Sequence, residues 1–219
     1  MIIIRGKKVL ISLGGTFEPI DSVRGITNKS SGKMGLALAK QAYILGADVT
    51  LIVANVSVEI SRLFKVIHVQ TSKQMADVIF DLVEDYDIFI STAAVSDFEV
   101  VERKNKKIDS DSSLSISLKP TIKIIRQIKR INPSIFLVGF KAEFNITRDE
   151  IIYCARKQIS DAGTDIVVAN DVSHKDCDFG SDKNEVLIID SDVLSVPLAS
   201  KDEIAKTIMD VISKKLSCR

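Results

Sequence analysis

The 219-residue sequence has no tryptophan, and aromatic residues make up only 5% of it. Aliphatic side chains must therefore fill the interior, and a hydrophobic content of 46% is enough for a sizeable core. Net charge is almost absent as well, because 30 lysines and arginines stand against 29 aspartates and glutamates. This balance argues against a nucleic-acid partner attracted by net charge, so a site for an anion must come from local placement of basic residues.

Cysteine is scarce, and its three positions are Cys154, Cys177 and Cys218. Their odd number and wide spacing argue against a disulfide framework or a zinc site and favour a reducing cytoplasm. Cys154 lies in a helical pattern, where we expect a small core residue. No apolar run approaches the roughly 20 residues that cross a bilayer, and the apolar start of the chain is too short for a secretory signal. We expect a soluble, cytoplasmic protein without a membrane partner.

Two marks of a dinucleotide site are also missing. The turn after the first apolar run lacks the pattern G-x-G-x-x-G, and the second apolar run ends in Ala54 and Asn55 where an acidic residue would bind a ribose hydroxyl. An NAD(P)-dependent oxidoreductase is therefore a weak alternative for this chain.

What the sequence does contain is an alternation of short apolar runs and helical patterns. Strands are expected at 8–13, 48–54, 65–69, 87–91, 114–118, 135–140 and 165–169, with a closing hairpin over 185–198. Helices are expected at 34–46, 71–83, 120–131, 148–163 and 200–216. This order predicts the α/β class, with a doubly wound, mostly parallel Rossmann-like sheet and a C-terminal β-hairpin in a single domain over 1–219.

The segment between the first strand and the first helix is long and polar. Gly14 and Gly15 allow a sharp turn, and Ser30 lies at the helix start, where free N–H groups favour an anion. Arg24 and Lys29 lie in the same loop of roughly 18 residues, a length that is usually functional or disordered. A connection made of ordinary turn and cap residues is the alternative. We expect a site for an anionic ligand here.

A second candidate stretch follows the strand at 87–91. Small residues at a strand's carboxyl end let a ligand approach closely, and Asp97 is placed to bind a ribose or a base amino group. A plain turn is the alternative interpretation of Asp97. The lysine-rich segment 101–113, which contains Lys107, is either a solvated loop or a flap whose ammonium groups neutralise phosphate charge.

The two parts of the first loop resemble the signature of phosphopantothenoylcysteine synthetase, a family of coenzyme A biosynthesis. They read Gly-Gly-Thr-Phe-Glu-Pro-Ile-Asp and Ile-Thr-Asn-Lys-Ser-Ser-Gly-Lys-Met-Gly. The resemblance continues, in order, at 93–97, 139–143, 169–171 and 179–182, and so covers nearly all of the chain. In many bacteria and archaea this enzyme is the C-terminal half of a fusion with the flavin decarboxylase that follows it in the pathway.

The resemblance implies a ligase of the CTP-dependent type. CTP, with Mg²⁺, would activate 4′-phosphopantothenate as an acyl-cytidylate and release pyrophosphate, and the amine of cysteine would then displace CMP. The choice between CTP and ATP stays open, and no metal ligand is assigned. A non-catalytic relative that only binds nucleotide or phosphopantetheine is the main alternative.

The resemblance also assigns residues to roles. Asn28 and Lys107 would be catalytic. Lys107 would begin the family's Lys-x-Lys motif, but Asp109 replaces its second lysine, and the motif could instead begin at Lys104. Substrate-binding residues would be Arg24, Asn28, Lys29 and Ala94. Nucleotide-binding residues would be Gly14, Gly15, Ser30, Ser91, Thr92, Ala93, Asp97, Lys107, Ile122, Lys123, Ile124, Ile125 and Phe140.

Two positions depart from the family pattern on the fourth expected helix. Gln158 and Ala162 stand where relatives often carry lysines, so Arg156, Lys157 or the flap would have to supply those phosphate contacts.

Family members are homodimers that share each active site, and the sequence offers a physical reason to expect the same here. Apolar Phe17, Ile20, Val23 and Ile26 in the first loop, with the edge of the closing hairpin, would be partly wet in a monomer. A two-fold axis could bury both surfaces.

Overall fold

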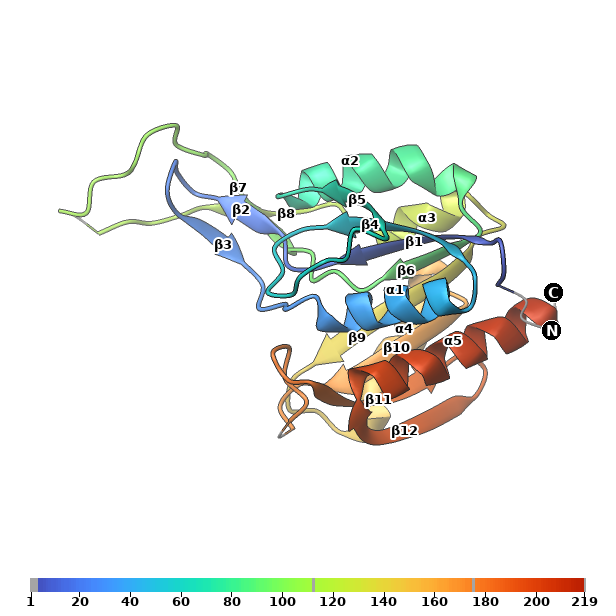
Figure 1. Ribbon diagram of the computed structural model, residues 1–219. Coiled ribbons are helices and arrows are strands. Elements are labelled where there is room, and N and C mark those ends of the chain that lie inside the picture. Colours follow the sequence, from blue (N-terminus) through green and yellow to red (C-terminus); the bar gives the residue numbers. More distant parts are fainter. Residues whose placement is uncertain (1–3, 112, 175, 219) are drawn as a thin grey trace.

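The computed structural model describes residues 4–111, 113–174 and 176–218 (Figure 1). Its centre is an eight-stranded sheet in the order β12-β11-β10-β9-β6-β1-β4-β5. The parallel strands are β1 (Lys8–Leu13), β4 (Asp48–Val53), β5 (Lys65–His68), β6 (Ile88–Ser91), β9 (Phe136–Glu143) and β10 (Ile166–Asp171). The closing hairpin consists of β11 (Lys183–Ile189) and β12 (Val193–Ser200), both antiparallel to their neighbours. The predicted class, winding and hairpin are confirmed, whereas the single-domain assignment stays a prediction.

Helices cover both faces of this sheet. One face carries α1 (Lys33–Ile44) and α5 (Lys201–Ser217), and the other carries α2 (Ser72–Leu82), the short helix η1 (Val83–Asp85), α3 (Ile125–Ile131) and α4 (Arg148–Ala162). Alternate residues of β1 serve the two layers, since Val9 and Ile11 pack toward α1 and α5 while Leu10 packs toward α2 and α3. Within the described part of the chain, no helix is both long and apolar enough to cross a bilayer.

Helix starts follow local sequence rules. The predicted capping box of the last helix is confirmed, because the Ser200 side chain accepts from the Glu203 N–H while the Glu203 carboxylate accepts from the Ser200 N–H. Thr71, one of the two predicted caps for α2, forms the same motif with Gln74. Only α1 among the four longest helices begins at a glycine, Gly32, with no side-chain cap.

The expected strand at 114–118 and helix start at Pro120 are wrong. The chain forms a strand later, β8 (Leu118–Pro120), which pairs with β7 (Phe98–Val100), and the helix begins only at Ile125. Thr121 explains the delay, because its N–H and hydroxyl donate to the backbone carbonyls of Asp97 and Ser96 and hold the backbone away from the helical path.

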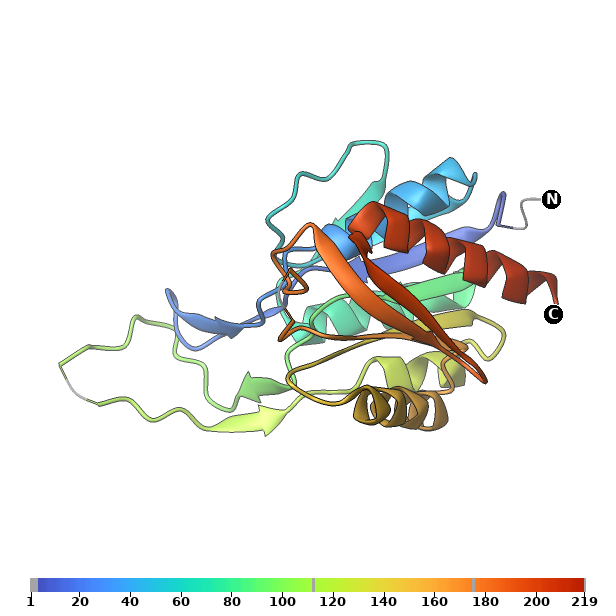
Figure 2. The ribbon, with the colours of Figure 1, turned by 90° about the horizontal axis from the view of Figure 1, so that it is seen from below.

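The long first loop also has regular structure that its polarity concealed. It folds into a hairpin of β2 (Phe17–Pro19) and β3 (Gly25–Thr27). This hairpin and the described parts of the segment 98–120, which are residues 98–111 and 113–120, project together from the carboxyl end of the sheet, as the blue and green elements at the left of Figures 1 and 2 show. We call these two segments the extension. The Lys104 N–H donates to the Ile20 carbonyl at 2.9 Å and joins the two parts.

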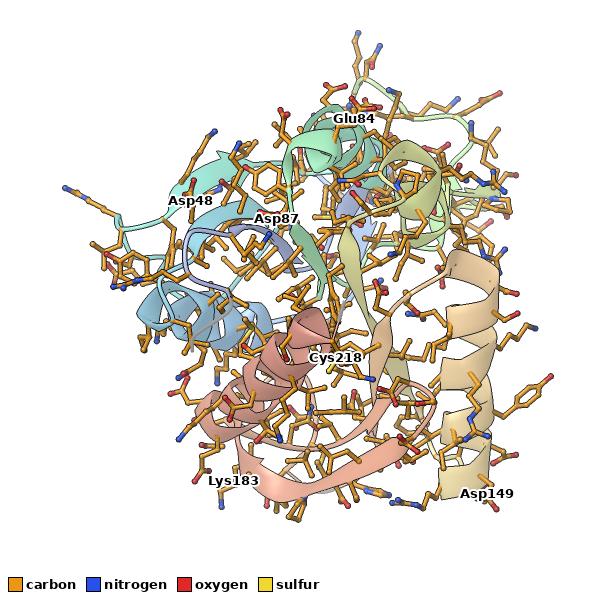
Figure 3. The ribbon with its side chains drawn as sticks, turned by 90° about the vertical axis from the view of Figure 1, so that its right-hand side faces the viewer. Asp48, Glu84, Asp87, Asp149, Lys183 and Cys218 are labelled. Atoms are coloured by element: carbon orange, nitrogen blue, oxygen red, sulfur yellow. The ribbon has the colours of Figure 1, made fainter. Side chains whose placement is uncertain are left out.

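At the opposite end of the sheet, where the parallel strands begin, charged side chains make contacts that stabilise the fold. Figure 3 looks onto this end, where Asp48 and Asp87 lie at the amino ends of β4 and β6. Asp87 accepts from the Lys7 ammonium at 2.8 Å and from the Lys8 N–H at 2.9 Å, which ties β1 to the segment that leads into β6. We therefore expect a ligand site at the other end of the sheet, where the parallel strands finish.

Candidate functional site

A cleft of about 970 Å³ opens at the carboxyl ends of β6 and β9, beside the start of α1. The chain first builds β4 and β5 on one side of β1 and then crosses to β6 on its other side. Open α/β sheets bind ligands at such a switch point, because the loops that leave the two central strands diverge there. The cleft thus lies between the two stretches that the sequence indicated.

Most of the predicted site residues line this cleft. They are Asn28, Lys29, Ser30, Ser91, Thr92, Ala93, Ala94, Asp97, Ile122, Lys123, Ile124, Ile125 and Phe140. Four predicted residues are not in its wall: Gly14, Gly15, Arg24 and Lys107. The structure brings the first set together and leaves the roles of all of them as predictions.

The two glycines bring three loops close together next to residues of the cleft wall. A side chain on Gly14, whose φ is +87°, would place a Cβ 2.5 Å from the Asn55 carbonyl oxygen, and one on Gly15 would come equally close to the Asn28 carbonyl oxygen. The Gly14 carbonyl also accepts from the Ala94 N–H at 2.8 Å. These glycines therefore set the distance between the first loop and the loop after β6.

We expect Gly14→Ala to lower the free energy of unfolding by about 1–3 kcal/mol, because the methyl group adds a backbone clash to an unfavourable φ. Gly6→Ala is the matched control: Gly6 has φ +76°, but nothing lies within 4 Å of the position that an added Cβ would take. Urea unfolding of both variants separates the clash from the strain. Equal losses in the two variants would contradict close packing at Gly14.

Asn28 is held against the loop that follows β6. Its side-chain amide donates to the carbonyl oxygens of Ala94 and Val95, each at 3.2 Å. The amide nitrogen thus has two acceptors in its own chain, although the residue itself is exposed to the cleft. A ligand acceptor would have to compete with these carbonyls or draw the amide toward itself.

Basic side chains surround the cleft, but several are already paired with acids. Lys123 contacts Asp97, Arg126 bonds Asp161 at 2.7 Å, and Lys141 lies 3.0 Å from Glu143. Their charge is partly compensated, so an anionic ligand would gain less from them than from free ammonium groups.

The two residues that depart from the family pattern lie on α4, at the wall of the cleft. Gln158 and Ala162 both line the cleft, as does Lys157, whereas Arg156 does not. The Gln158 amide nitrogen is buried and has no hydrogen-bond partner among the described residues. Of the two helix residues that the sequence offers as substitutes, Lys157 is the one that lines the cleft.

The expectation that Cys154 is a core residue is wrong. Its side chain is half-buried and lines the cleft, because it lies on the face of α4 that looks across to β9. Burial, with a contribution from Glu143, raises the pKa of this thiol, so it stays protonated at neutral pH.

Two lysines in the cleft wall, Lys33 and Lys201, contact a neighbouring loop of the same chain. Lys33 donates to the Gly180 carbonyl at 2.6 Å and to Asp182 at 2.7 Å, and the buried Lys201 donates to the Ser181 carbonyl. The two lysines bind the loop at 178–182 against the start of α1. The sequence predicts a turn at 179–182 but not these contacts, and the position of Lys201 directly after a helix cap is typical of a surface lysine.

The remaining two predicted residues lie on the extension. Arg24 donates to the Asp21 carboxylate at 2.7 Å and to the Ile108 carbonyl at 2.6 Å. Lys107 is exposed and directly precedes Ile108 in the chain. Neither side chain reaches the cleft of its own chain.

Comparison with known proteins gives a match over residues 4–216 to the family described as the DNA/pantothenate metabolism flavoprotein C-terminal domain. The chain is 44% identical, over 216 residues and 97% of its length, to the coenzyme A biosynthesis bifunctional protein CoaBC of Thermococcus kodakarensis. The match includes 52% of that relative, so the chain spans about half the length of the curated relatives it matches.

Two solved structures have a similar fold. The DNA/pantothenate metabolism flavoprotein from Streptococcus pneumoniae gives a TM-score of 0.85 at 27% identity, covering 96% of this chain and 100% of that one. The C-terminal domain of a coenzyme A biosynthesis bifunctional protein CoaBC gives 0.84 at 28% identity and covers both chains completely.

Proposed function

Because the chain belongs to the family described as the DNA/pantothenate metabolism flavoprotein C-terminal domain, we propose that it is a ligase that joins 4′-phosphopantothenate to cysteine in coenzyme A biosynthesis. CTP activates the pantothenate carboxylate as an acyl-cytidylate and releases pyrophosphate, and the cysteine amine then displaces CMP. The observation that carries the proposal is the position of Asn28 in the cleft, between the start of α1 and the loop after β6.

The start of α1 supports a site for the triphosphate. Its first turn has no acidic residue and its N-cap is Gly32, whereas α4 and α5 both begin with acidic residues and capping boxes. The Lys33 N–H makes a long bond of 3.4 Å to the Ser31 hydroxyl, and the start of α1 can therefore offer N–H groups to an anion. Lys29 and Lys157 line the same cleft and add positive charge. Ile122, Ile125 and Phe140 offer an apolar wall for the base.

Mg²⁺ fits this site as a companion of the nucleotide. Magnesium usually keeps several waters and binds one or two carboxylates together with phosphate oxygens. Asp97 lines the cleft and is exposed, and its carboxylate would bind such an ion in place of its present partner, the Lys123 ammonium. Magnesium would neutralise the charge that develops on the phosphates, while this chain's residues orient the carboxylate and the amine.

A homodimer fits the position of the extension. Large apolar side chains on the extension are exposed: Val23, Phe98, Val101, Leu114, Ile116 and Leu118. Phe17, Ile20 and Ile26 are half-buried, so the exposed surface is larger on the 98–120 segment than on the hairpin. A second copy would cover these side chains, and it would bring Arg24 and Lys107 to the partner's cleft.

Mixing two inactive variants tests this arrangement. If Asn28 and Lys107 act in one site but come from different subunits, then mixed dimers of Asn28→Asp and Lys107→Gln chains contain one intact site. Equal mixing should restore about a quarter of the wild-type activity, because half of the dimers are mixed and half of their sites are intact. A fully active monomer in sedimentation at assay concentration would refute the dimer.

Further partners follow from the family. The relatives are about twice as long, and we propose that the reaction is linked to a flavin-dependent decarboxylase that consumes its product. The three free cysteines fit a reducing cytoplasm as the compartment.

The direct test of the function is CMP release from CTP by the full chain. We expect release only when both 4′-phosphopantothenate and cysteine are present, with one phosphopantothenoylcysteine formed for each CMP. Parallel reactions with ATP measure the nucleotide preference. Tight nucleotide binding without turnover would favour a non-catalytic relative and contradict the proposal.

A further inference from the structure

Both backbone polar groups of Ile108 are bound by the hairpin of the extension. The Ile108 N–H donates to the Asp21 carboxylate at 3.0 Å, and the Ile108 carbonyl accepts from the Arg24 guanidinium at 2.6 Å. Arg24 in turn donates to the same carboxylate through Nε and Nη2, at 3.0 and 2.7 Å. Two side chains of the hairpin, Asp21 and Arg24, thus bind the backbone of one residue, Ile108, in the other segment of the extension.

Asp21 is built into the hairpin and cannot easily turn away. Its side chain is fully buried, and its other oxygen accepts from the N–H groups of Val23 and Arg24 at 2.8 and 2.7 Å. The Ile108 and Val23 N–H groups hold the pKa of this carboxyl well below its usual value. Asp21 therefore stays ionised throughout the neutral range and keeps its attraction for Arg24 and the Ile108 N–H.

Side-chain burial contributes little to the order of the bound segment. Every side chain from 101 to 111 is exposed except Ile108, which is half-buried, and the segment has no regular secondary structure. The hairpin binds it through backbone atoms at two places, Lys104 and Ile108. Lys107 lies between these two attachments, so they limit where its ammonium group can go.

We propose that Asp21 and Arg24 are positioning residues that hold the segment 104–108 and thereby place Lys107 for the activation step. We call these two residues the clamp. The inference rests on the proposed function for the role of Lys107. Arginine suits the task because its planar fork can bond a carboxylate and a neighbouring carbonyl at once, whereas a lysine ammonium lacks this geometry. Contacts to backbone atoms also leave the side chains of the segment free to meet a ligand.

The first measurement does not depend on activity. Amide hydrogen exchange of the full chain, followed at Ile108, should be at least about tenfold faster in Asp21→Asn and in Arg24→Lys than in the wild type. Asp77→Asn is the matched control: it removes an exposed ion pair with Lys73 on α2 and should leave exchange at Ile108 unchanged. Unchanged exchange in both clamp variants, at an unchanged melting temperature, would overturn the inference.

The second measurement asks whether the clamp acts through Lys107. Asp21→Asn and Arg24→Lys should each lower kcat about tenfold or more, with a smaller change in the KM for cysteine. Asp21→Asn added to Lys107→Gln should cause no further loss, because the placed group is already gone. Multiplied losses would show that the clamp acts elsewhere and would overturn its positioning role.

The two measurements separate failure of the inference from failure of the proposed function. A wild-type chain without ligase activity would refute the function, and with it the role for Lys107, while faster exchange would still establish the clamp. If Asp21→Asn does not fold, Arg24→Lys, which keeps the charge and the buried carboxylate, decides both points.

Discussion

Replacing Asn28 with aspartate is expected to abolish formation of 4′-phosphopantothenoylcysteine while the fold remains. The wild-type amide donates to the carbonyl oxygens of Ala94 and Val95, and a carboxylate can donate to neither. It would be repelled by both oxygens and would add negative charge beside a phosphorylated acyl group. Loss of a donor that stabilises developing charge typically costs about 10²–10³ in rate, and we expect at least this loss in the overall reaction.

The measurement is product formation from CTP, 4′-phosphopantothenate and cysteine, with circular dichroism as the check on folding. Gln41→Glu is the matched control, because it makes the same amide-to-carboxylate change on α1 away from the cleft wall. If the first half-reaction survives in Asn28→Asp, the acyl-cytidylate should accumulate on the enzyme. A wild-type rate of product formation would remove Asn28 from the mechanism.

The second large effect is expected at Lys107. Changing it to glutamine should slow pyrophosphate release by about 10²–10³, because a positive donor to the phosphates is lost. The same change at Lys104 or Lys106 should have a much smaller effect. Lys104 is paired with Glu102 at 3.0 Å, so its ammonium is already partly neutralised.

Single-turnover measurement of pyrophosphate isolates this step from the later attack by cysteine. All three lysine variants lie on the same exposed segment, so each serves as a control for the others. A larger loss in Lys104→Gln than in Lys107→Gln would mean that the Lys-x-Lys motif begins at Lys104 and that Lys104 is the essential lysine.

Most of the sheet could be predicted from the sequence because its strands and helices are marked by patterns among residues that are neighbours in the chain. Buried strands such as 8–13 and 165–169 are short apolar runs, and helix starts carry their own caps, as at Ser200. Two stretches that follow β1 and β6 were then bound to meet, since parallel strands end at the same edge and these two are neighbours. The cleft residues taken from those stretches accordingly lie together.

The parts that could not be predicted depend on contacts between segments far apart in the chain. The extension is ordered by hydrogen bonds from the hairpin to the backbone of residues 104 and 108. The hydrophobic periodicity of the sequence does not indicate such bonds. The helix start at Ile125 is delayed by bonds from Thr121 to the segment after β6. Lys201 follows an ordinary helix cap, and only the fold of 178–182 over it makes it a buried residue of the cleft.

The central proposal is that this cleft activates the carboxylate of 4′-phosphopantothenate as an acyl-cytidylate and transfers the acyl group to cysteine, and labelled oxygen tests it most directly. In that route a carboxylate oxygen attacks the α-phosphorus of CTP, pyrophosphate leaves, and the cysteine amine later displaces CMP at the acyl carbon. With ¹⁸O in the carboxylate of 4′-phosphopantothenate, the account predicts one labelled oxygen in the CMP released and none in pyrophosphate. Unlabelled CMP accompanied by normal product formation would contradict it.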